Sequence, residues 1–329
     1  MKGLLNSRRT QWVLLAAALS LPFLARALEF SFLTRVGGVV GLLMLLSLGL
    51  NVTLGYVGLF DLGFIAFYAV GAYATAILMR AHVAAPLAVV LAVALTVVIR
   101  FLLGLTILRL RGDYLAVVTM GFGEIARLTF NNLDALTNGP KGLQVRPWRP
   151  LSFLGAWKPL EFVRKESNVQ FYFLIVAAVF LAAEASRRLE DSRVGRAWVA
   201  IREDEVAARL SGIPVREYKL LAFTLSAVFA GLAGALFALW DQFVTPESFI
   251  FWESILLVAI VVLGGMGSIV GVLLGALILG GIPLLMEATL SPQWIDYRYL
   301  FFGIILVLMT LFRPQGLLPS ARREAELSS

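Results

Sequence analysis

A small set of polar and charged side chains interrupts the apolar runs of this chain, and these are the first candidates for chemistry. They are Asn51, Asp61, Thr119, Glu124, Arg127 and Glu253. Polar groups are costly in a lipid bilayer, so those within apolar segments commonly mark a substrate or ion path. We therefore predict that Asn51, Asp61, Thr119 and Glu124, together with Tyr68, line a translocation path.

Several of these residues have a plainer interpretation. Asp61 lies in a glycine-rich stretch, where its carboxylate would accept hydrogen bonds from exposed amides. Glu124 and Arg127 are one helical turn apart and could simply neutralise each other. Glu253 opens an apolar run, where an acidic residue suits a helix N-terminus.

Other kinds of chemistry have little support. The sequence contains no cysteine and a single histidine, His82, which leaves few ligands for a metal site and few nucleophile–base pairs. It also lacks the G-x-x-x-x-G-K-[ST] phosphate loop, so we do not expect it to hydrolyse ATP in the usual manner. We expect no catalytic residue, metal or cofactor in this chain.

Composition sets the class of protein. Hydrophobic residues make up 60% of the 329 positions, charged residues 15%, and the mean hydropathy is +0.86. A soluble domain has roughly half apolar and about a quarter charged residues. Lipid must therefore solvate much of the chain, and the net charge of +7 indicates membrane orientation rather than nucleic-acid binding.

The apolar runs predict an all-α membrane protein, a bundle of about ten transmembrane helices in a single domain, 1–329. A run from Glu253 to Met286 would be about 50 Å long as one helix, too long for one span, and glycines interrupt it, so we expect two short spans there. The expected runs are Trp12–Leu28, Val36–Leu54, Tyr56–Met79, Ala84–Leu108, Tyr114–Phe130, Phe171–Ala185, Leu220–Trp240, Glu253–Met286 and Tyr299–Phe312.

The distribution of Lys and Arg predicts orientation. The basic segment 186–219 and the tail 313–329 should be cytoplasmic, as should the N-terminus. The loop 131–170 is then periplasmic despite its own basic residues, because long loops cross with less regard to charge. Alternatively, Arg8-Arg9 and Ala25-Arg-Ala27 belong to a signal peptide, whose cleavage would remove one span.

Glycines crowd the apolar runs in two places. Small residues let membrane helices pack closely, and they also permit broken helices along a path. Both interpretations stay open for the candidate hinge positions, which are Gly55, Gly58, Gly63, Gly264, Gly265 and Gly267.

The stretch from Arg193 to Pro214 predicts one or two short amphipathic helices on the cytoplasmic side. Three acids, Glu203 to Glu205, suit the start of a helix, and Gly212 suits its C-terminal cap. The apolar side of this helix must be buried against something. The consecutive acids argue against lipid headgroups and favour a protein partner.

At these segments the chain resembles the membrane permeases of branched-chain amino acid ABC importers, specifically the LivM-like subunit. Each matching stretch is moderately specific, and their order and spacing strengthen the match. The stretches are Gly49–Tyr73, Leu108–Ala116, Gly121–Ile125, Gly195–Gly212, Leu263–Ser268 and Phe312–Gly316.

This resemblance implies an ABC importer permease in a bacterial inner membrane. Its implied partners are a LivH-like permease, two cytoplasmic ATPases that bind ATP and Mg²⁺, and a periplasmic substrate-binding protein. The helix near Glu203–Ser211 would be the coupling helix seated on an ATPase. The residues implied in coupling are Arg202, Glu203, Asp204, Glu205, Ala208, Arg209 and Gly212.

Three other functions remain open at this stage. A secondary transporter or channel would also lack a phosphate loop, but it would not need a capped cytoplasmic helix. A related ABC permease could carry urea, a sugar or another small polar solute. A membrane-embedded enzyme is the weakest alternative, because it should show clustered His, Asp or Glu at a membrane face.

Overall fold

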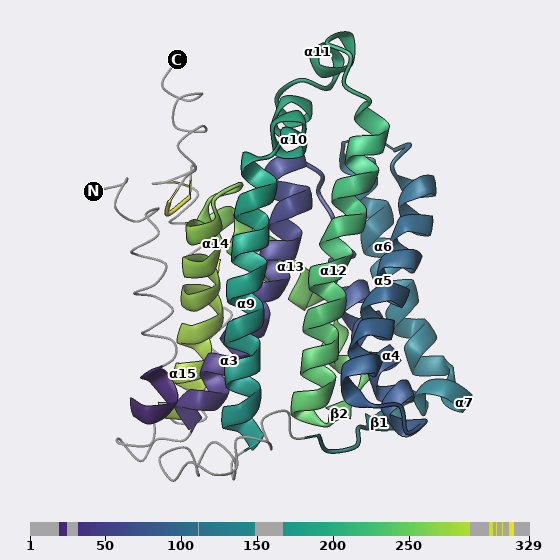
Figure 1. The fold of residues 1–329 in the computed structure, drawn as a ribbon, viewed down its shortest axis with the longest axis vertical. Helices are drawn as coiled ribbons and strands as arrows, with labels where there is room; N and C mark the ends of the chain where they lie inside the picture. The colour runs from purple at the N-terminus through teal and green to yellow at the C-terminus, as the bar shows by residue number, and fades with distance from the viewer. Residues whose placement is uncertain are drawn as a thin grey trace.

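The computed structural model describes residues 20–24, 32–110, 112–148 and 167–289, together with 303, 304, 307, 311 and 316–318. Long helices run side by side along the molecule (Figure 1). The first half contains α3 (Phe32–Leu50), the π-helix η1 (Asn51–Val57), α4 (Phe64–Arg80), α5 (Ala85–Ile107), α6 (Asp113–Asn132), α7 (Asp134–Thr137), the 3₁₀-helix η2 (Gly139–Lys141) and β1 (Leu143–Gln144).

The second half begins with α9 (Ser167–Asp191) and ends with three short helical segments that follow one another. Its elements are α9, α10 (Arg193–Glu203), α11 (Glu205–Leu210), α12 (Val215–Asp241), β2 (Phe243–Val244), the 3₁₀-helix η4 (Pro246–Phe249), α13 (Phe251–Gly264), α14 (Ile269–Ala276), the π-helix η5 (Leu277–Gly281) and α15 (Ile282–Thr289).

The two ends of the molecule differ. Helices α10 and α11 form one tip, whereas α7 and the antiparallel pair β1–β2 lie at the opposite end (Figure 1). That pair joins the loop after α6 to the loop after α12, with Leu143 opposite Val244. We call these two ends the α11 end and the β1–β2 end.

Within the described residues, six helical segments are long and apolar enough to cross a bilayer, and Phe64–Arg80 is a shorter apolar helix. The chain is thus an all-α, multi-pass membrane protein. The six segments are Phe32–Val57, Ala85–Ile107, Asn168–Asp191, Val215–Asp241, Pro246–Gly264 and Ile269–Met286.

The predicted count of about ten spans is not confirmed. The runs Trp12–Leu28 and Tyr299–Phe312 lie largely outside the described residues. The predicted span Tyr114–Phe130 is helical, as α6, but it is not among the six long apolar segments. Glu124 and Arg127 within it lower its hydropathy, which accounts for the difference.

Of the two predicted helix breaks, one lies where it was expected and the other is shifted along the chain. The long run after Glu253 does break at residues 265–268, where Gly265 and Gly267 have φ values of 112° and 82°. The expected boundary between the runs Val36–Leu54 and Tyr56–Met79 differs from the structure, because the helix continues through η1 to Val57. The chain turns at Gly58, another of the candidate hinge positions, whose φ is 77°, and α4 begins at Phe64.

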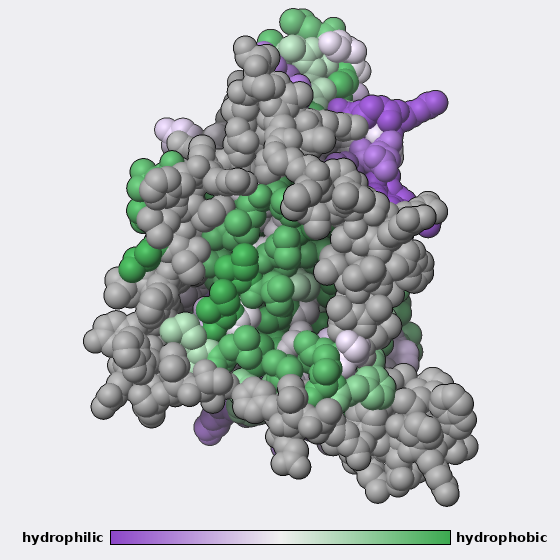
Figure 2. Space-filling model, turned by 90° about the vertical axis from the view of Figure 1, so that its left-hand side faces the viewer, coloured by the Kyte–Doolittle hydropathy of each residue, from purple (hydrophilic) through white to green (hydrophobic). Residues whose placement is uncertain are grey.

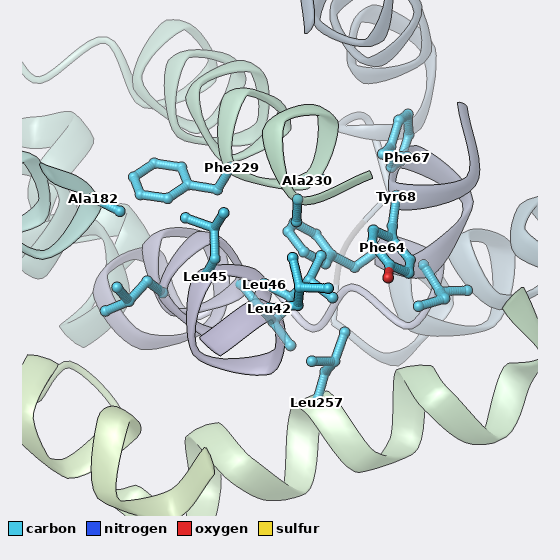
Figure 3. Packing of buried hydrophobic residues seen from close by; sticks show 14 of the residues in the cluster. Leu42, Leu45, Leu46, Phe64, Phe67, Tyr68, Ala182, Phe229, Ala230 and Leu257 are labelled. Atoms are coloured by element: carbon cyan, nitrogen blue, oxygen red, sulfur yellow. The ribbon is translucent and has the colours of Figure 1, made fainter. Parts of the chain in front are cut away.

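Helix α12 lies at the centre of the bundle and packs along α4, α5 and α3. The α4–α12 contact is close because glycines face each other: a Cβ on Gly71 would lie 2.6 Å from the carbonyl oxygen of Gly231. Leucine and phenylalanine side chains from α3, α4, α12 and α13 fill the core around this contact (Figure 3).

Candidate functional site

Helix α11 is a short helix fixed at both ends by its own sequence. The Asp204 carboxylate accepts hydrogen bonds from the amides of Val206 and Ala207, at 2.7 and 2.9 Å. Gly212, with φ of 83°, reverses the chain so that the Ile213 amide bonds the Ala208 carbonyl at 3.1 Å. Caps of this kind let a helix of only six residues form.

The outer face of α11 is apolar and exposed. Val206 and Leu210, one turn apart, are 65% and 84% exposed. Apolar side chains gather at the upper tip of the molecule, where α11 lies (Figure 2). An exposed aliphatic pair on a rigid, capped helix is suited to burial against a partner protein.

The inner face of α11 is held to the bundle. Ala208 is buried, and the Glu205 carboxylate accepts from Lys219 of α12 at 2.6 Å and from Arg209 at 3.1 Å. Of the predicted acids, only Glu205 and the cap Asp204 belong to the start of α11. Glu203 is the last residue of α10, which corrects its predicted place at the start of the helix.

Arg202 points away from the tip and into the bundle. Its Nη1 donates to the Gly55 carbonyl of η1 at 2.7 Å, and a Cβ on Gly58 would lie 2.9 Å from its Cγ. Gly58 therefore leaves the space that the Arg202 side chain occupies. This placement assigns Arg202 to the contact between α10 and the membrane helices rather than to the exposed face.

Trp198 forms a second link at the same place. Its ring is fully buried, stacks on Tyr56 of η1 with centroids 6.4 Å apart, and donates from Nε1 to the Tyr218 carbonyl at 2.8 Å. A tryptophan buried with its N–H satisfied is a rigid anchor. Helix α10 is thus fastened to both η1 and α12, and we call the contact of α10 with η1 the η1 junction.

The η1 junction extends to the second helix break. The Oδ1 of Asn51 accepts from the Gly267 amide at 2.9 Å, and a Cβ on Gly55 would lie 2.6 Å from that same nitrogen. Residues 316–318 add to this break, since the Leu317 amide donates to the Leu263 carbonyl at 2.8 Å. Asn51, predicted to line a path, here joins two broken helices.

Asp61 takes part in a buried ion pair. Its Oδ2 lies 2.5 Å from Nη2 of Arg100, and both side chains are fully buried. Arg100 also donates from Nε to the Phe223 carbonyl at 2.6 Å, and its guanidinium stacks over the Phe67 and Phe223 rings. The pair holds α5 to the turn between η1 and α4.

Arg100 is a residue that the sequence reasoning missed. It is the charged residue within the apolar run Ala84–Leu108, and a charge inside such a run is itself a signal of a buried partner. Its partner could not be named from the sequence, because Asp61 is 39 positions away.

The remaining path candidates lie in separate places. Thr119 is buried, and its hydroxyl accepts from the Leu62 amide at 3.1 Å, so it fastens α6 to the same turn as Asp61. Glu124 pairs with Arg127 at 2.5 Å, as the alternative interpretation predicted, and is 42% exposed. Tyr68 lines a cavity near the β1–β2 end. The five candidates therefore do not form one site.

Among the described residues, no group of three or more His, Cys, Asp or Glu side chains is placed to hold a metal ion. The charged side chains described above form ion pairs instead, either between elements, as in Asp61–Arg100 and Glu205–Lys219, or within one helix, as in Glu124–Arg127.

Comparison with known proteins decides the family. Residues 32–310 match the family described as "Branched-chain amino acid transport system / permease component". The chain belongs to this permease family. It is a transport protein and not an enzyme, as its relatives also indicate.

The relatives include both kinds of Liv permease. The LivM permease of the high-affinity branched-chain amino acid transport system of Escherichia coli K12 is 40% identical, over 96% of this chain and 76% of that protein. The LivH permease of Salmonella typhimurium is 32% identical over 57% of this chain and 59% of LivH. The fructose import permease FrcC of Rhizobium meliloti is 31% identical over 43% of this chain and 40% of FrcC. No solved structure matches the chain.

Proposed function

We propose that this permease forms half of the translocation path of an ATP-driven importer of branched-chain amino acids. The substrate proposal rests on the likeness to LivM over nearly the whole chain. The observation that carries the energy-coupling part is the capped helix α11, which exposes Val206 and Leu210 at the tip while Trp198 and Arg202 fasten its neighbour α10 to the bundle.

The proposed assembly follows from this division of roles. A separate ATPase seats α11 in a groove, a LivH-like permease completes the path, and a periplasmic binding protein delivers the substrate. Movement of α11 then reaches the membrane helices through the η1 junction, since Arg202 and Trp198 contact η1 directly. ATP and Mg²⁺ are bound by the ATPase subunits.

The partners are tested by purifying the full-length chain from its native membrane in mild detergent. We expect an ATPase and a second permease to accompany it. Leu210→Asp should remove the ATPase and leave the second permease, because a carboxylate would be buried in an apolar groove. Leu136→Asp is the control, because Leu136 is also an exposed leucine, at 48%, and lies on α7 at the other end of the molecule. Equal ATPase recovery from both variants would refute docking through α11.

The orientation is tested with single thiols, which the absence of cysteine makes straightforward. In intact spheroplasts, a membrane-impermeant maleimide should label Leu136→Cys, because the loop 131–170 is periplasmic in this proposal. It should label Ser211→Cys only after the membrane is opened. The reverse pattern would place α11 outside and contradict ATP-driven coupling.

The likeness to the fructose permease supports a second candidate, import of another small polar solute. The two candidates are distinguished by measuring leucine uptake by the reconstituted transporter with unlabelled leucine, fructose or urea as competitor. Leucine alone should compete if the first proposal is right.

A further inference from the structure

A cavity of about 300 Å³ opens between α3, α4, α12, η4 and α13, near the β1–β2 end. Its mouth is marked by Arg35, in the first turn of α3, and Asp241, the last residue of α12. Figure 1 places both of these helix ends opposite α11. The volume lies at the small end of the range for ligand sites in proteins.

The cavity is lined by both polar and apolar side chains. Its polar residues include Arg35, Asp241 and Ser248, with Glu253 of α13 and Tyr68 of α4. Leu42, Leu46 and Leu257 also line it and are almost fully buried. Figure 3 shows these leucines and Tyr68 converging from α3, α13 and α4.

The charged groups at this cavity differ from those elsewhere in the bundle. Asp61 and Arg100 pair with both side chains fully buried, whereas the Arg35–Asp241 pair is long, at 3.4 Å, with side chains 60% and 40% exposed. An exposed pair of this kind contributes little to stability and can exchange partners readily. Both signs of charge are therefore available to a solute entering the cavity.

We propose that this cavity binds an α-amino acid zwitterion with an apolar side chain. The carboxylates of Asp241 and Glu253 accept hydrogen bonds from its ammonium, and the Arg35 guanidinium donates to its carboxylate. Leu42, Leu46 and Leu257 take its side chain out of water. A purely anionic solute would face two carboxylates, and a purely cationic one would face Arg35. This inference rests on the proposed function and adds a site for the solute within this subunit.

The test is equilibrium binding of radiolabelled L-leucine to the full-length chain purified with its accompanying subunits and without a binding protein. Val39→Trp fills the cavity from a half-buried position of α3. Leu91→Trp, at a 43% exposed position of α5, is the matched control. We expect leucine binding to weaken about tenfold or more in the first variant and to stay unchanged in the second.

The charged groups are tested by which analogues compete. 4-Methylpentanoate lacks the ammonium of leucine, and 3-methylbutylamine lacks its carboxylate. Glu253→Gln should reduce the binding preference for leucine over 4-methylpentanoate by about tenfold. Arg35→Gln should reduce the binding preference for leucine over 3-methylbutylamine by about tenfold. A change that is merely structural would weaken all three ligands alike, so these ratios decide the matter even if Val39→Trp does not fold.

Uptake by the wild-type transporter separates the two proposals. If proteoliposomes import leucine but the purified chain does not bind it, or binds it equally well in Val39→Trp and Leu91→Trp, the cavity inference is overturned and the proposed function stands. If the wild-type assembly imports no amino acid, both are overturned.

Discussion

The α11 end and the β1–β2 end of this permease use polar side chains in opposite ways. Near α11, polar groups tie one backbone segment to another: Asn51 to Gly267, Arg202 to Gly55, and Asp61 to Arg100. Near β1–β2, Arg35 and Asp241 line the mouth of an open cavity. This difference fits the two proposals made for this permease, namely that the α11 end transmits movement and the β1–β2 end receives a solute.

The largest effect on stability is expected from breaking the buried Asp61–Arg100 ion pair. Arg100→Ala leaves the Asp61 carboxylate buried without its cation, which should cost about 3–5 kcal/mol of unfolding free energy. The double variant Arg100→Met, Asp61→Leu should recover most of that loss, because both charges are gone. Thermal unfolding in detergent measures both. If the single variant is as stable as the wild type, the pair does not hold α5 to the turn.

Disrupting the η1 junction should reduce stability less than breaking the ion pair, but it should reduce the coupling of ATP hydrolysis to uptake more. Arg202→Ala removes a charged hydrogen bond to the Gly55 carbonyl, worth about 1.5–3 kcal/mol. We expect the ATPase to remain bound while leucine uptake per ATP falls. Arg196→Ala is the control, because Arg196 is an exposed residue of the same helix α10 whose Nη1 donates to the Asp191 carbonyl rather than to η1. Equal uptake per ATP in the two variants would show that Arg202 does not transmit movement.

Asn51→Ala tests whether this residue is structural or lines the path. Loss of its carbonyl leaves the buried Gly267 amide without its acceptor, which should cost about 1–2 kcal/mol. A structural role predicts lower thermal stability with the same half-saturating leucine concentration. A path role predicts the reverse, a changed half-saturating concentration at unchanged stability.

The smallest effect is expected at the half-exposed pair on α6. Glu124→Gln should change stability by less than about 1 kcal/mol, because exposed pairs are screened by solvent. Leucine uptake should also be unchanged. A large loss of uptake in a stable Glu124→Gln protein would return this residue to the translocation path.

Much of the fold could be predicted from local sequence, and its errors have physical causes. Apolar runs indicated the long helices, and glycines indicated the break at residues 265–268. The boundary between the second and third apolar runs was placed at Gly55, whereas the helix ends before Gly58, because Gly55 and Gly58 look alike in sequence and only Gly58 adopts positive φ. The apolar pattern also gave no sign that residues 51–57 form a π-helix.

The candidate sites were harder to predict because they depend on contacts between distant segments. The capped helix α11 was recognisable from Asp204 and Gly212, which act within a few residues of each other. Arg100 lies on α5 and Asp61 in the turn before α4, and the cavity draws on five helical segments. No local periodicity could have paired them.

The most direct test of the central claim is leucine uptake and ATP hydrolysis measured together in proteoliposomes that contain the whole transporter. Wild type should import leucine only with ATP, and Leu210→Asp should abolish ATP-driven uptake while the membrane domain remains folded. ATP-independent uptake by the wild type, or normal uptake by Leu210→Asp, would contradict an importer that is driven through α11.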